Sequence, residues 1–222
     1  MIEGLALLGA GGFAREMYWH VQETWPGTPI VFVDDVTDTQ VVTVGGRDFP
    51  VIKDWNFNHI AGIPGAAGPV SIRHFSIAIG EPKAKRIMAA KAIDAGLEPA
   101  PTVVHPRALV QGSDCVIGRG GVITPGCVVT TNVRIGDYVL INLNCTVGHD
   151  AVLNNFVTCN PGCHVSGNVT LGEGVSLGTG TAVREKTAIA AGVVTGAQSC
   201  VAKPIETENI VVAGVPAKPL GG

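Results

Sequence analysis

The chain has 222 residues, of which 46% are hydrophobic and 15% are charged, and its formal net charge is −3. This balance supports a sizeable core in one large or two modest domains and argues against disorder. There is no basic cluster, which argues against a nucleic-acid partner, and no apolar stretch reaches the roughly 20 residues that span a bilayer. The opening residues lack the basic lead of a signal peptide, so we expect a cytoplasmic protein.

The first third of the chain alternates two kinds of pattern. Short apolar runs in "LALLGAGG", "IVFVDD" (30–35) and "SIRHFSIAIG" predict buried strands. We expect one amphipathic helix to start near Phe13, after the first glycine turn, and another in "EPKAKRIMAAKAIDAG", which Gly96 closes. This alternation predicts a small parallel α/β domain over residues 1–98.

The first glycine turn matches a nucleotide-binding fingerprint. Gly9, Gly11 and Ala14 have its spacing, and Asp34 and Asp35 follow near the distance at which a carboxylate meets a ribose. A dinucleotide fold needs two such halves, whereas this chain changes pattern after one. We therefore expect a Rossmann-like half domain with a mononucleotide-type site, where backbone N–H groups of the turn lie near a phosphate. Alternatively, the glycines only allow close packing of strand and helix.

The second part of the chain, residues 99–222, carries a repeat of six. From Ile117 to Val201 in steps of six, thirteen of fifteen positions are Ile, Leu or Val, and no insertion breaks the register. The next residue is usually small or turn-forming, as at Gly118 and Asn142. A period of six fits short strands joined by corners, three to a coil, rather than a helix or a continuous strand. The pattern predicts a hexapeptide β-helix with five coils of eighteen residues.

The six cysteines form no CxxC pair, and the nearest approach is Cys159 with Cys163 in "CNPGC". Cys127, Cys145 and Cys163 are eighteen residues apart, so the repeat stacks them on one face inside the prism. A buried thiol behaves as a small hydrophobic group and is not an accessible nucleophile. We therefore expect neither a metal site nor disulfides.

Several motifs together point to one family: "LLGAGGFARE", "VFVDD", "AIG", then "IN" and "VGHD" within the repeat, "NPGCHVSGNV", and the ending "VVAGVPAKPL". With them, nearly the whole chain resembles the hexapeptide-repeat sugar acyltransferases, which include bacterial nucleotide-4-amino-sugar N-acetyltransferases and sialic acid O-acetyltransferase-like proteins. The resemblance implies a left-handed parallel β-helix, acetyl-CoA as co-substrate without a metal, a nucleotide-sugar substrate, and a homotrimer with active sites between subunits.

By position, the resemblance implies that His149 is the general base, Asp150 the acidic neighbour that tunes it, and Asn142 an active-site asparagine. It also implies that the backbone N–H of Gly167 meets the acetyl carbonyl. The positions that match the coenzyme site are Thr158, Gly167, Thr179, Ala197, Pro216 and Lys218, and those that match the sugar-nucleotide site are Gly11, Gly12, Phe13, Arg15, Asp34, Asp35 and Gly80.

Two positions depart from the family pattern. Thr158 and Phe13 stand where many members have histidine. The first departure leaves the direct role of side chain 158 open, and the second leaves the identity of the nucleotide sugar open.

The residues around His149 agree with a catalytic role. His149 is third in its hexad and is expected on a strand, facing outward, between the small Thr131 one coil earlier and Gly167 one coil later. A ligand lying along the prism can therefore reach the ring, and an imidazole suits proton abstraction at neutral pH. We expect the other histidines to be inert (His20, His59, His74 and His105) or, for His164, to lie near the same groove.

Together with the resemblance, these residues predict direct acyl transfer without an acyl-enzyme. The sugar amine attacks the thioester carbonyl, His149 removes its proton, and the Gly167 amide stabilises the oxyanion. Three alternatives stay open: O-acetylation of a sugar hydroxyl such as that of a sialic acid, an NAD-dependent oxidoreductase, and a non-catalytic scaffold or ice-binding solenoid. The missing second half-fold disfavours the oxidoreductase, and the lack of a regular threonine row disfavours ice binding.

Overall fold

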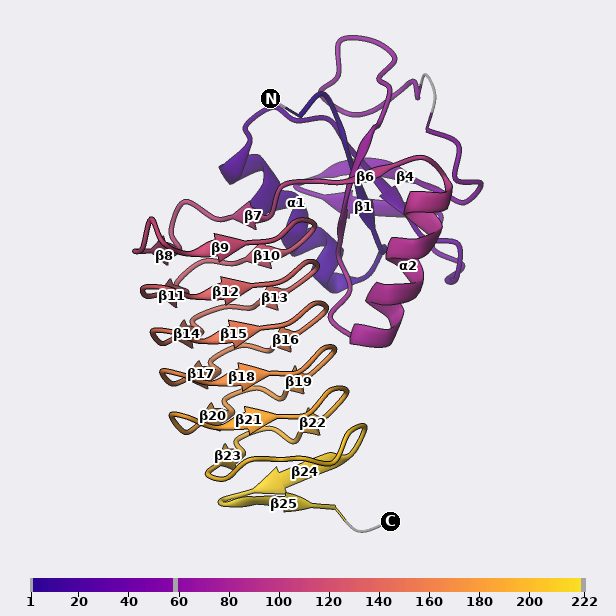
Figure 1. The fold of residues 1–222 in the computed structure, drawn as a ribbon. Helices are drawn as coiled ribbons and strands as arrows, with labels where there is room; N and C mark the ends of the chain where they lie inside the picture. Colours follow the sequence, from indigo (N-terminus) through magenta and orange to yellow (C-terminus); the bar gives the residue numbers. More distant parts are fainter. Residues whose placement is uncertain (1, 58–59, 221–222) are drawn as a thin grey trace.

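The computed structural model describes residues 2–57 and 60–220, in which an α/β domain lies against one end of a long parallel β-helix (Figure 1). The strand order of the N-terminal sheet is β3-β4-β2-β1-β5-β6. Its strands are β1 (Leu5–Leu8), β2 (Ile30–Val33), β3 (Val41–Val44), β4 (Arg47–Ile52), β5 (His74–Ile77) and β6 (Glu98–Pro99). All neighbouring strands in this order pair in parallel except β3 and β4, which pair antiparallel. The predicted strands are present, and the β3–β4 hairpin is an addition that the sequence analysis missed.

Helices α1 (Gly12–Thr24) and α2 (Pro82–Asp94) cover opposite faces of this sheet. Side chains alternate along β1, so Leu5 and Leu7 share a core with α1, whereas Ala6 and Leu8 share another with α2. The turn between β1 and α1 needs a glycine at position 9, because its φ of 122° lies in the region that other residues avoid.

Three sheets form the faces of the β-helix. The first face contains β7 (Val103–Val104), β10 (Val122–Ile123), β13 (Leu140–Ile141), β16 (Thr158–Cys159), β19 (Ser176–Leu177), β22 (Val194–Thr195), β24 (Val211–Gly214) and β25 (Ala217–Pro219). The second contains β8 (Leu109–Val110), β11 (Val128–Val129), β14 (Thr146–Val147), β17 (His164–Val165), β20 (Ala182–Val183) and β23 (Cys200–Val201). The third contains β9 (Val116–Ile117), β12 (Arg134–Ile135), β15 (Val152–Leu153), β18 (Thr170–Leu171) and β21 (Ala188–Ile189).

Turns between the faces stack into three edges, which we number along the chain. The first edge joins the first and second faces and includes 142–145, 160–163, 178–181 and 196–199. The second edge joins the second and third faces and includes 130–133, 148–151, 166–169 and 184–187. The third edge returns to the first face and includes 136–139, 154–157 and 172–175.

The predicted eighteen-residue register is confirmed by strand pairing. Val128 pairs with Thr146, and Thr146 pairs with His164. Two strands, β7 and β8, precede the first predicted hexad at Ile117 and complete a coil with β9 inside the predicted 99–222 domain. In that coil Val110 pairs with Val129, nineteen positions later, so the turn between β8 and β9 holds one extra residue.

The turn geometry corrects one interpretation of the repeat. From Gly120 to Gln198, every sixth residue has a positive φ, and this residue lies three positions after each inward aliphatic. The small residues directly after the aliphatics are instead required by contact between coils. A Cβ on Gly148, for example, would lie 2.6 Å from the backbone nitrogen of Gly167.

The stacked cysteines lie inside the prism, as predicted. The side chains of Cys127, Cys145 and Cys163 are buried, and all three thiols are free. Each thiol donates a hydrogen bond to a backbone carbonyl of the next coil, over 3.1–3.2 Å. The thiols therefore satisfy polar groups of the coil turns and have no access to substrate.

Aromatic stacking and a buried lysine join the two parts of the chain at the third edge. Phe75 stacks on Tyr138 and Tyr138 on Phe156, with interplanar angles of 14° and 12°. Lys85 of α2 is 2% exposed and donates to the carbonyls of Tyr138 and Val157 over 2.9 and 3.0 Å. Burial lowers the pKa of Lys85 to about 7. These contacts fix α2 against the β-helix.

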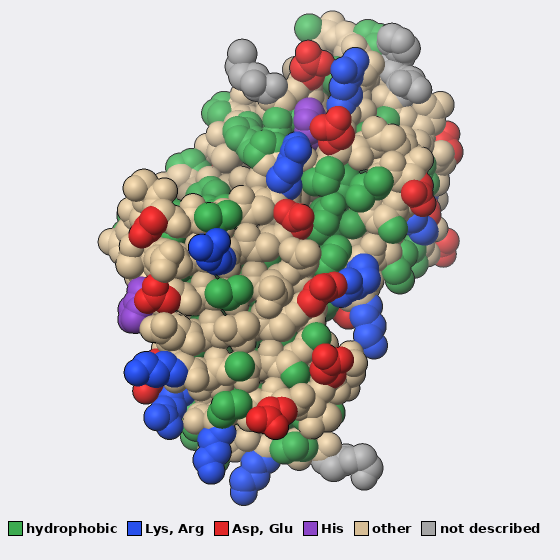
Figure 2. All heavy atoms as spheres, in the orientation of Figure 1, with side chains coloured by type: hydrophobic (Ala, Val, Ile, Leu, Met, Phe, Trp, Pro, Cys, Tyr) green, Lys and Arg blue, Asp and Glu red, His purple; other side chains and the backbone are tan. Residues whose placement is uncertain are grey.

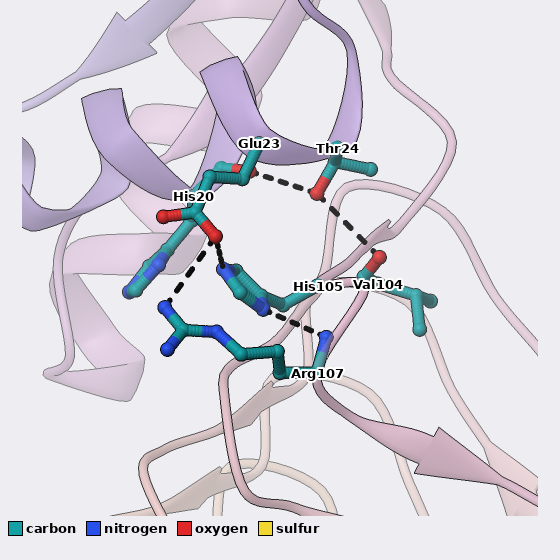
Figure 3. Close-up of polar contacts among 6 residues, drawn as sticks. All are labelled: His20, Glu23, Thr24, Val104, His105 and Arg107. Carbon is teal, nitrogen blue, oxygen red and sulfur yellow. Dashed lines mark hydrogen bonds and ion pairs between the residues drawn. The ribbon is translucent and has the colours of Figure 1, made fainter.

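A second polar junction lies between α1 and the start of the β-helix (Figure 3). Nε2 of His105 lies 3.0 Å from a Glu23 carboxylate oxygen, and Nδ1 accepts from the Arg107 N–H over 3.0 Å. The ring of His20 meets that of His105 edge-on, with centroids 5.3 Å apart. Burial, with a smaller contribution from His105, lowers the pKa of His20 to about 4. Both histidines therefore contribute contacts at the junction between α1 and the β-helix.

This junction predicts a defined loss of stability in acid. The pKa of His20 is lower in the folded chain than in the unfolded chain, so the unfolded chain binds more protons and the free energy of unfolding falls as pH drops from about 6.5 to 4. We expect His20 to account for a loss on the order of 3 kcal/mol by pH 4. Urea unfolding of the wild type and His20→Leu between pH 8 and pH 4 tests this, with pH 8 as each protein's baseline. Parallel pH dependences of the two proteins would contradict it.

Candidate active site

His149 and Asp150 form an exposed pair on the second edge. Nδ1 of His149 lies 2.7 Å from Oδ2 of Asp150, and the two side chains are 59% and 42% exposed. The prediction that His149 faces outward is confirmed. The prediction that it lies on a strand is wrong, because the residue belongs to the turn between β14 and β15, and Asp150 has a φ of 60°.

Hydrogen bonds stabilise the ionised form of Asp150. Its pKa is lowered first by the hydrogen bond to His149 and then by the hydrogen bond from Asn132. A carboxylate only accepts hydrogen bonds, so the ring hydrogen of neutral His149 is on Nδ1. Nε2 then carries the free lone pair that a general base needs.

Gly167 leaves the space that the ring occupies. A Cβ on Gly167 would lie 2.5 Å from Nε2 of His149. Among the described residues, the Gly167 N–H has no hydrogen-bond acceptor, while the His149 carbonyl accepts from Asn168 over 2.8 Å. The predicted stacking of these two positions is therefore confirmed, and a free amide lies beside the imidazole.

Other predicted residues lie on a different edge. Asn142, Thr179 and Ala197 belong to the first edge, one prism face away from His149. Thr179 and Ala197 are exposed, and the Asn142 side chain accepts from the N–H of Leu143 over 2.8 Å. A single chain thus divides the predicted site between two edges.

Thr158 and Gly80 meet at the domain junction. Thr158 is 1% exposed on β16, and its hydroxyl donates to the Gly80 carbonyl over 2.6 Å. The side chain that replaces the family's histidine therefore connects the β-helix to the α/β domain. Pro216 lies in the turn of the β24–β25 hairpin, and the exposed Lys218 is on β25.

His164 lies on the second face, where Nδ1 is 3.0 Å from the Thr146 hydroxyl. This strand joins the edges that carry Asn142 and His149. His74 is on β5, and His59 lies outside the described residues.

A largely apolar pocket of about 420 Å³ lies where β1, β2 and β5 end. Its lining includes Gly9, Gly11 and Asp34, together with Ile87 and Met88 of α2. Gly11 is the N-cap residue of α1 and provides no side-chain cap, so N–H groups at the start of α1 lack that partner. The predicted glycine turn and the first carboxylate thus share one pocket.

The two carboxylates after β2 have different surroundings. Burial raises the pKa of Asp34, but hydrogen bonds from Thr37 and Val36 together with the charge of Lys53 lower it below its usual value. Asp35 accepts from Lys91 over 2.7 Å and from the Trp55 indole over 3.0 Å. Asp35 therefore connects α2 to the loop near residue 55.

The remaining predicted sugar-nucleotide residues lie in the first turn of α1. Gly12 begins the helix, Phe13 is half-buried against the core, and Arg15 is exposed.

The sequence analysis missed a group of basic residues near the exposed histidine. Arg184 and Lys186 lie on the second edge two coils beyond His149, and Lys203 stands eighteen positions after Glu185. All three cations are exposed, and Figure 2 shows Lys and Arg gathered below a histidine on this side of the β-helix. Their spacing along the repeat was a signal that could have revealed them.

No group of three or more His, Cys, Asp and Glu side chains suited to a metal ion occurs within the described ranges. In residues 2–57 and 60–220, no helix has the length and apolar character needed to cross a membrane.

Comparison with known proteins identifies the family, although no family model matches the chain. The acetyltransferase domain of PglB from Neisseria gonorrhoeae FA1090 is 32% identical, with a TM-score of 0.82, over 98% of this chain and 100% of that one. The chain belongs to the hexapeptide-repeat sugar acyltransferase family. The predicted resemblance is therefore confirmed.

Two further relatives of this acyltransferase are named for perosamine. A mutant of perosamine N-acetyltransferase from Caulobacter crescentus, in complex with CoA and GDP-perosamine, is 25% identical, with a TM-score of 0.82, over 100% of this chain and 99% of that one. GDP-perosamine N-acetyltransferase from Escherichia coli O157:H7 is 28% identical over 142 residues. The matched region spans 58% of that curated relative's length.

The contact between His149 and Gly167 predicts that a methyl group added at position 167 displaces the imidazole ring. Gly167→Ala keeps an allowed backbone, but its Cβ would overlap the imidazole, so we expect the ring to turn away and lose its bond to Asp150. A crystal structure of the variant measures the Nδ1–Oδ2 distance. Gly68→Ala is the matched control, because nothing lies within 4 Å of a Cβ at that position. An unchanged His149–Asp150 distance in Gly167→Ala would contradict the packing.

Proposed function

We propose that this protein transfers the acetyl group of acetyl-CoA to the amine of a nucleotide-linked 4-amino-6-deoxy sugar. The observation that carries the proposal is the exposed His149–Asp150 pair beside the free amide of Gly167. The structural neighbours support the substrates: one is a perosamine N-acetyltransferase with CoA and GDP-perosamine, and another is an acetyltransferase domain with acetyl coenzyme A.

His149 is the general base in this proposal. Asp150 holds the ring hydrogen on Nδ1, so Nε2 accepts a proton from the sugar amine as the nitrogen attacks the thioester carbonyl. The N–H of Gly167 donates to the carbonyl oxygen as negative charge develops there. The C–S bond then breaks, the amide forms, and the proton on Nε2 passes to the leaving thiolate.

No acyl-enzyme takes part. Within the described residues, no serine hydroxyl or cysteine thiol is hydrogen-bonded to His149, whose ring contacts Asp150 instead. The stacked cysteines face the core. Direct transfer between two bound substrates is therefore the mechanism that these residues support.

The second edge supplies a path for the coenzyme. The thioester lies near Gly167 in this proposal, and the phosphates of CoA extend towards Arg184, Lys186 and Lys203. Arg184 is paired with Glu185 over 3.3 Å, whereas Lys186 and Lys203 have no ion pair among the described residues. These two lysines are thus the ammonium groups best placed to meet phosphate.

The nucleotide occupies the pocket where β1, β2 and β5 end. Gly9 and Gly11 let the backbone approach a phosphate, and the uncapped start of α1 provides N–H donors for it. The Rossmann-like half domain over 1–98 thus holds the acceptor, and the left-handed β-helix over 99–222 holds the donor. Asp34 lies in the pocket lining, where its carboxylate can accept from a ribose or base.

A homotrimer explains why one chain divides the site between two edges. His149 and Gly167 lie on the second edge, whereas Asn142, Thr179 and Ala197 lie on the first. If one subunit's first edge faces its neighbour's second edge, the coenzyme has both sets of residues along its length. Three-fold symmetry repeats this contact and closes the ring. Light scattering that shows a monomer at micromolar concentration would contradict this assembly.

The test of the function is thiol release from acetyl-CoA with a panel of acceptors. The panel contains UDP-, GDP- and dTDP-linked 4-amino-6-deoxy sugars, CMP-sialic acid and free sialic acid. Turnover with an amino sugar is the expected result. Turnover only with sialic acid would replace N-acetylation by O-acetylation, and silence with every acceptor would contradict the proposal.

Removal of the base separates catalysis from binding. His149→Asn should lower kcat at least about a hundredfold with little change in either KM, because general-base catalysis contributes roughly 10²–10⁴-fold. Steady-state kinetics at saturating substrates measures the change. Near wild-type turnover in His149→Asn would contradict the role of the imidazole.

The basic residues predict an effect limited to the coenzyme. Lys186→Ala and Lys203→Ala should raise KM for acetyl-CoA several-fold and leave KM for the sugar unchanged, since each substitution removes a cation from the phosphates. Arg134→Ala is the matched control, because this exposed cation lies on the third face. Equal effects of all three substitutions would show that the second edge is not the phosphate site.

A further inference from the structure

A series of polar contacts leads along the second edge to His149. It begins at Asp114, in the turn that holds the extra residue between β8 and β9. The Asp114 carboxylate accepts from the Thr131 hydroxyl over 2.8 Å and from the N–H of Asn132. One coil further, Nδ2 of Asn132 donates to Oδ1 of Asp150 over 2.6 Å. The other Asp150 oxygen accepts from His149.

We propose that Asn132 is a positioning residue, which acts through Asp150 to hold the His149 ring in the tautomer and orientation needed for acetyl transfer. The proposal rests on the proposed function for its catalytic consequence. Its structural part, the effect of Asn132 on the His149 ring, concerns the resting protein and stands independently of the substrate.

Asp150 needs such support because it is exposed. Its side chain is 42% exposed, so its carboxylate competes with water for every contact and has no core packing to fix its rotamer. Asn132 binds Oδ1 and leaves Oδ2 for the histidine. Asn132 thus orients the carboxylate through one oxygen, and the carboxylate orients the His149 ring through the other.

The backbone at this edge presents the Asn132 amide towards the next coil. Asn132 and Asp150 both have left-handed backbone, with φ of 53° and 60°, and the Asp150 N–H donates to the Thr131 carbonyl over 3.2 Å. Asparagine and aspartate tolerate this conformation better than most residues. Asp114 adds a constraint on the same turn by binding Thr131 and Asn132. Asp114 in the preceding coil therefore holds the Asn132 backbone, while the Asn132 side chain binds Asp150 in the following coil.

The chain provides a matched control at Asn168. It is the same residue type on the same edge, one coil beyond Asp150, and its φ is 57°. Its side chain has no hydrogen-bond partner among residues 2–57 and 60–220, and its backbone N–H binds the His149 carbonyl whatever the side chain. Glycine accepts a positive φ at either position, so Asn132→Gly and Asn168→Gly each remove one amide without backbone strain.

The first measurement is the tautomer of His149 by long-range ¹H–¹⁵N NMR of the substrate-free protein, with the signal assigned by its absence in His149→Gln. We expect mainly Nδ1–H in the wild type and in Asn168→Gly, and a substantial Nε2–H population in Asn132→Gly. Asn132→Asp removes the donor while keeping the shape, and its second carboxylate should disturb Asp150 further. An unchanged tautomer in both position-132 variants would overturn the proposal.

The second measurement is steady-state kinetics with acetyl-CoA and the accepted sugar. We expect Asn132→Gly to lower kcat about tenfold without raising either KM, a part of what general-base catalysis contributes, and Asn168→Gly to match the wild type. An equal loss of kcat in both glycine variants would show that the substitutions only destabilise the second edge, and it would overturn the positioning role of Asn132. If the wild type shows no transfer while the tautomer still depends on Asn132, the proposed function fails and the structural effect of Asn132 remains.

Discussion

The eighteen-residue register of the β-helix is the constraint on which the rest of the structure depends. Parallel pairing holds each residue above the one eighteen positions earlier, and a positive φ at every sixth position from 120 to 198 turns the chain from face to face. The register sets His149 against Gly167, Asp150 against Asn132, and each inward thiol against a carbonyl. A change of one residue in length alters the separation only of the pairs that span it, as in the first coil, where an extra turn residue makes Val110 pair with Val129.

The same register explains how much could be predicted from the sequence. Ile117 to Val201 recur every six residues, so the β-helix, the buried cysteines and the contact of His149 with Gly167 follow from counting. The predicted strand for His149 was wrong because the period gives the repeat and leaves the position of the turn within it undetermined. The hydrogen bond from Thr158 to Gly80 could not be predicted, since it joins residues 78 positions apart in different domains.

Contacts outside the repeat also determine what the α/β domain offers a ligand. Asp34 and Asp35 are neighbours in sequence, yet one lines the pocket and the other binds Lys91 of α2 and Trp55. Asp34 accepts from N–H groups of its own loop, whereas Asp35 meets a lysine side chain that α2 brings to the end of β2. The aromatic stack through Tyr138 and the buried Lys85 then hold this domain on the third edge, away from the edge that carries His149.

The central claim of the account is that two edges from different subunits make one site. Co-expression of His149→Asn with Ala197→Trp, purified through a separate tag on each chain, tests it directly, because each variant damages only one edge. The account predicts that mixed assemblies recover transfer at about a third of their sites, since every trimer with both kinds of chain has one interface at which the two intact edges meet. Mixed assemblies as inactive as either parent would show that both edges of one chain serve the same site, which would contradict the account.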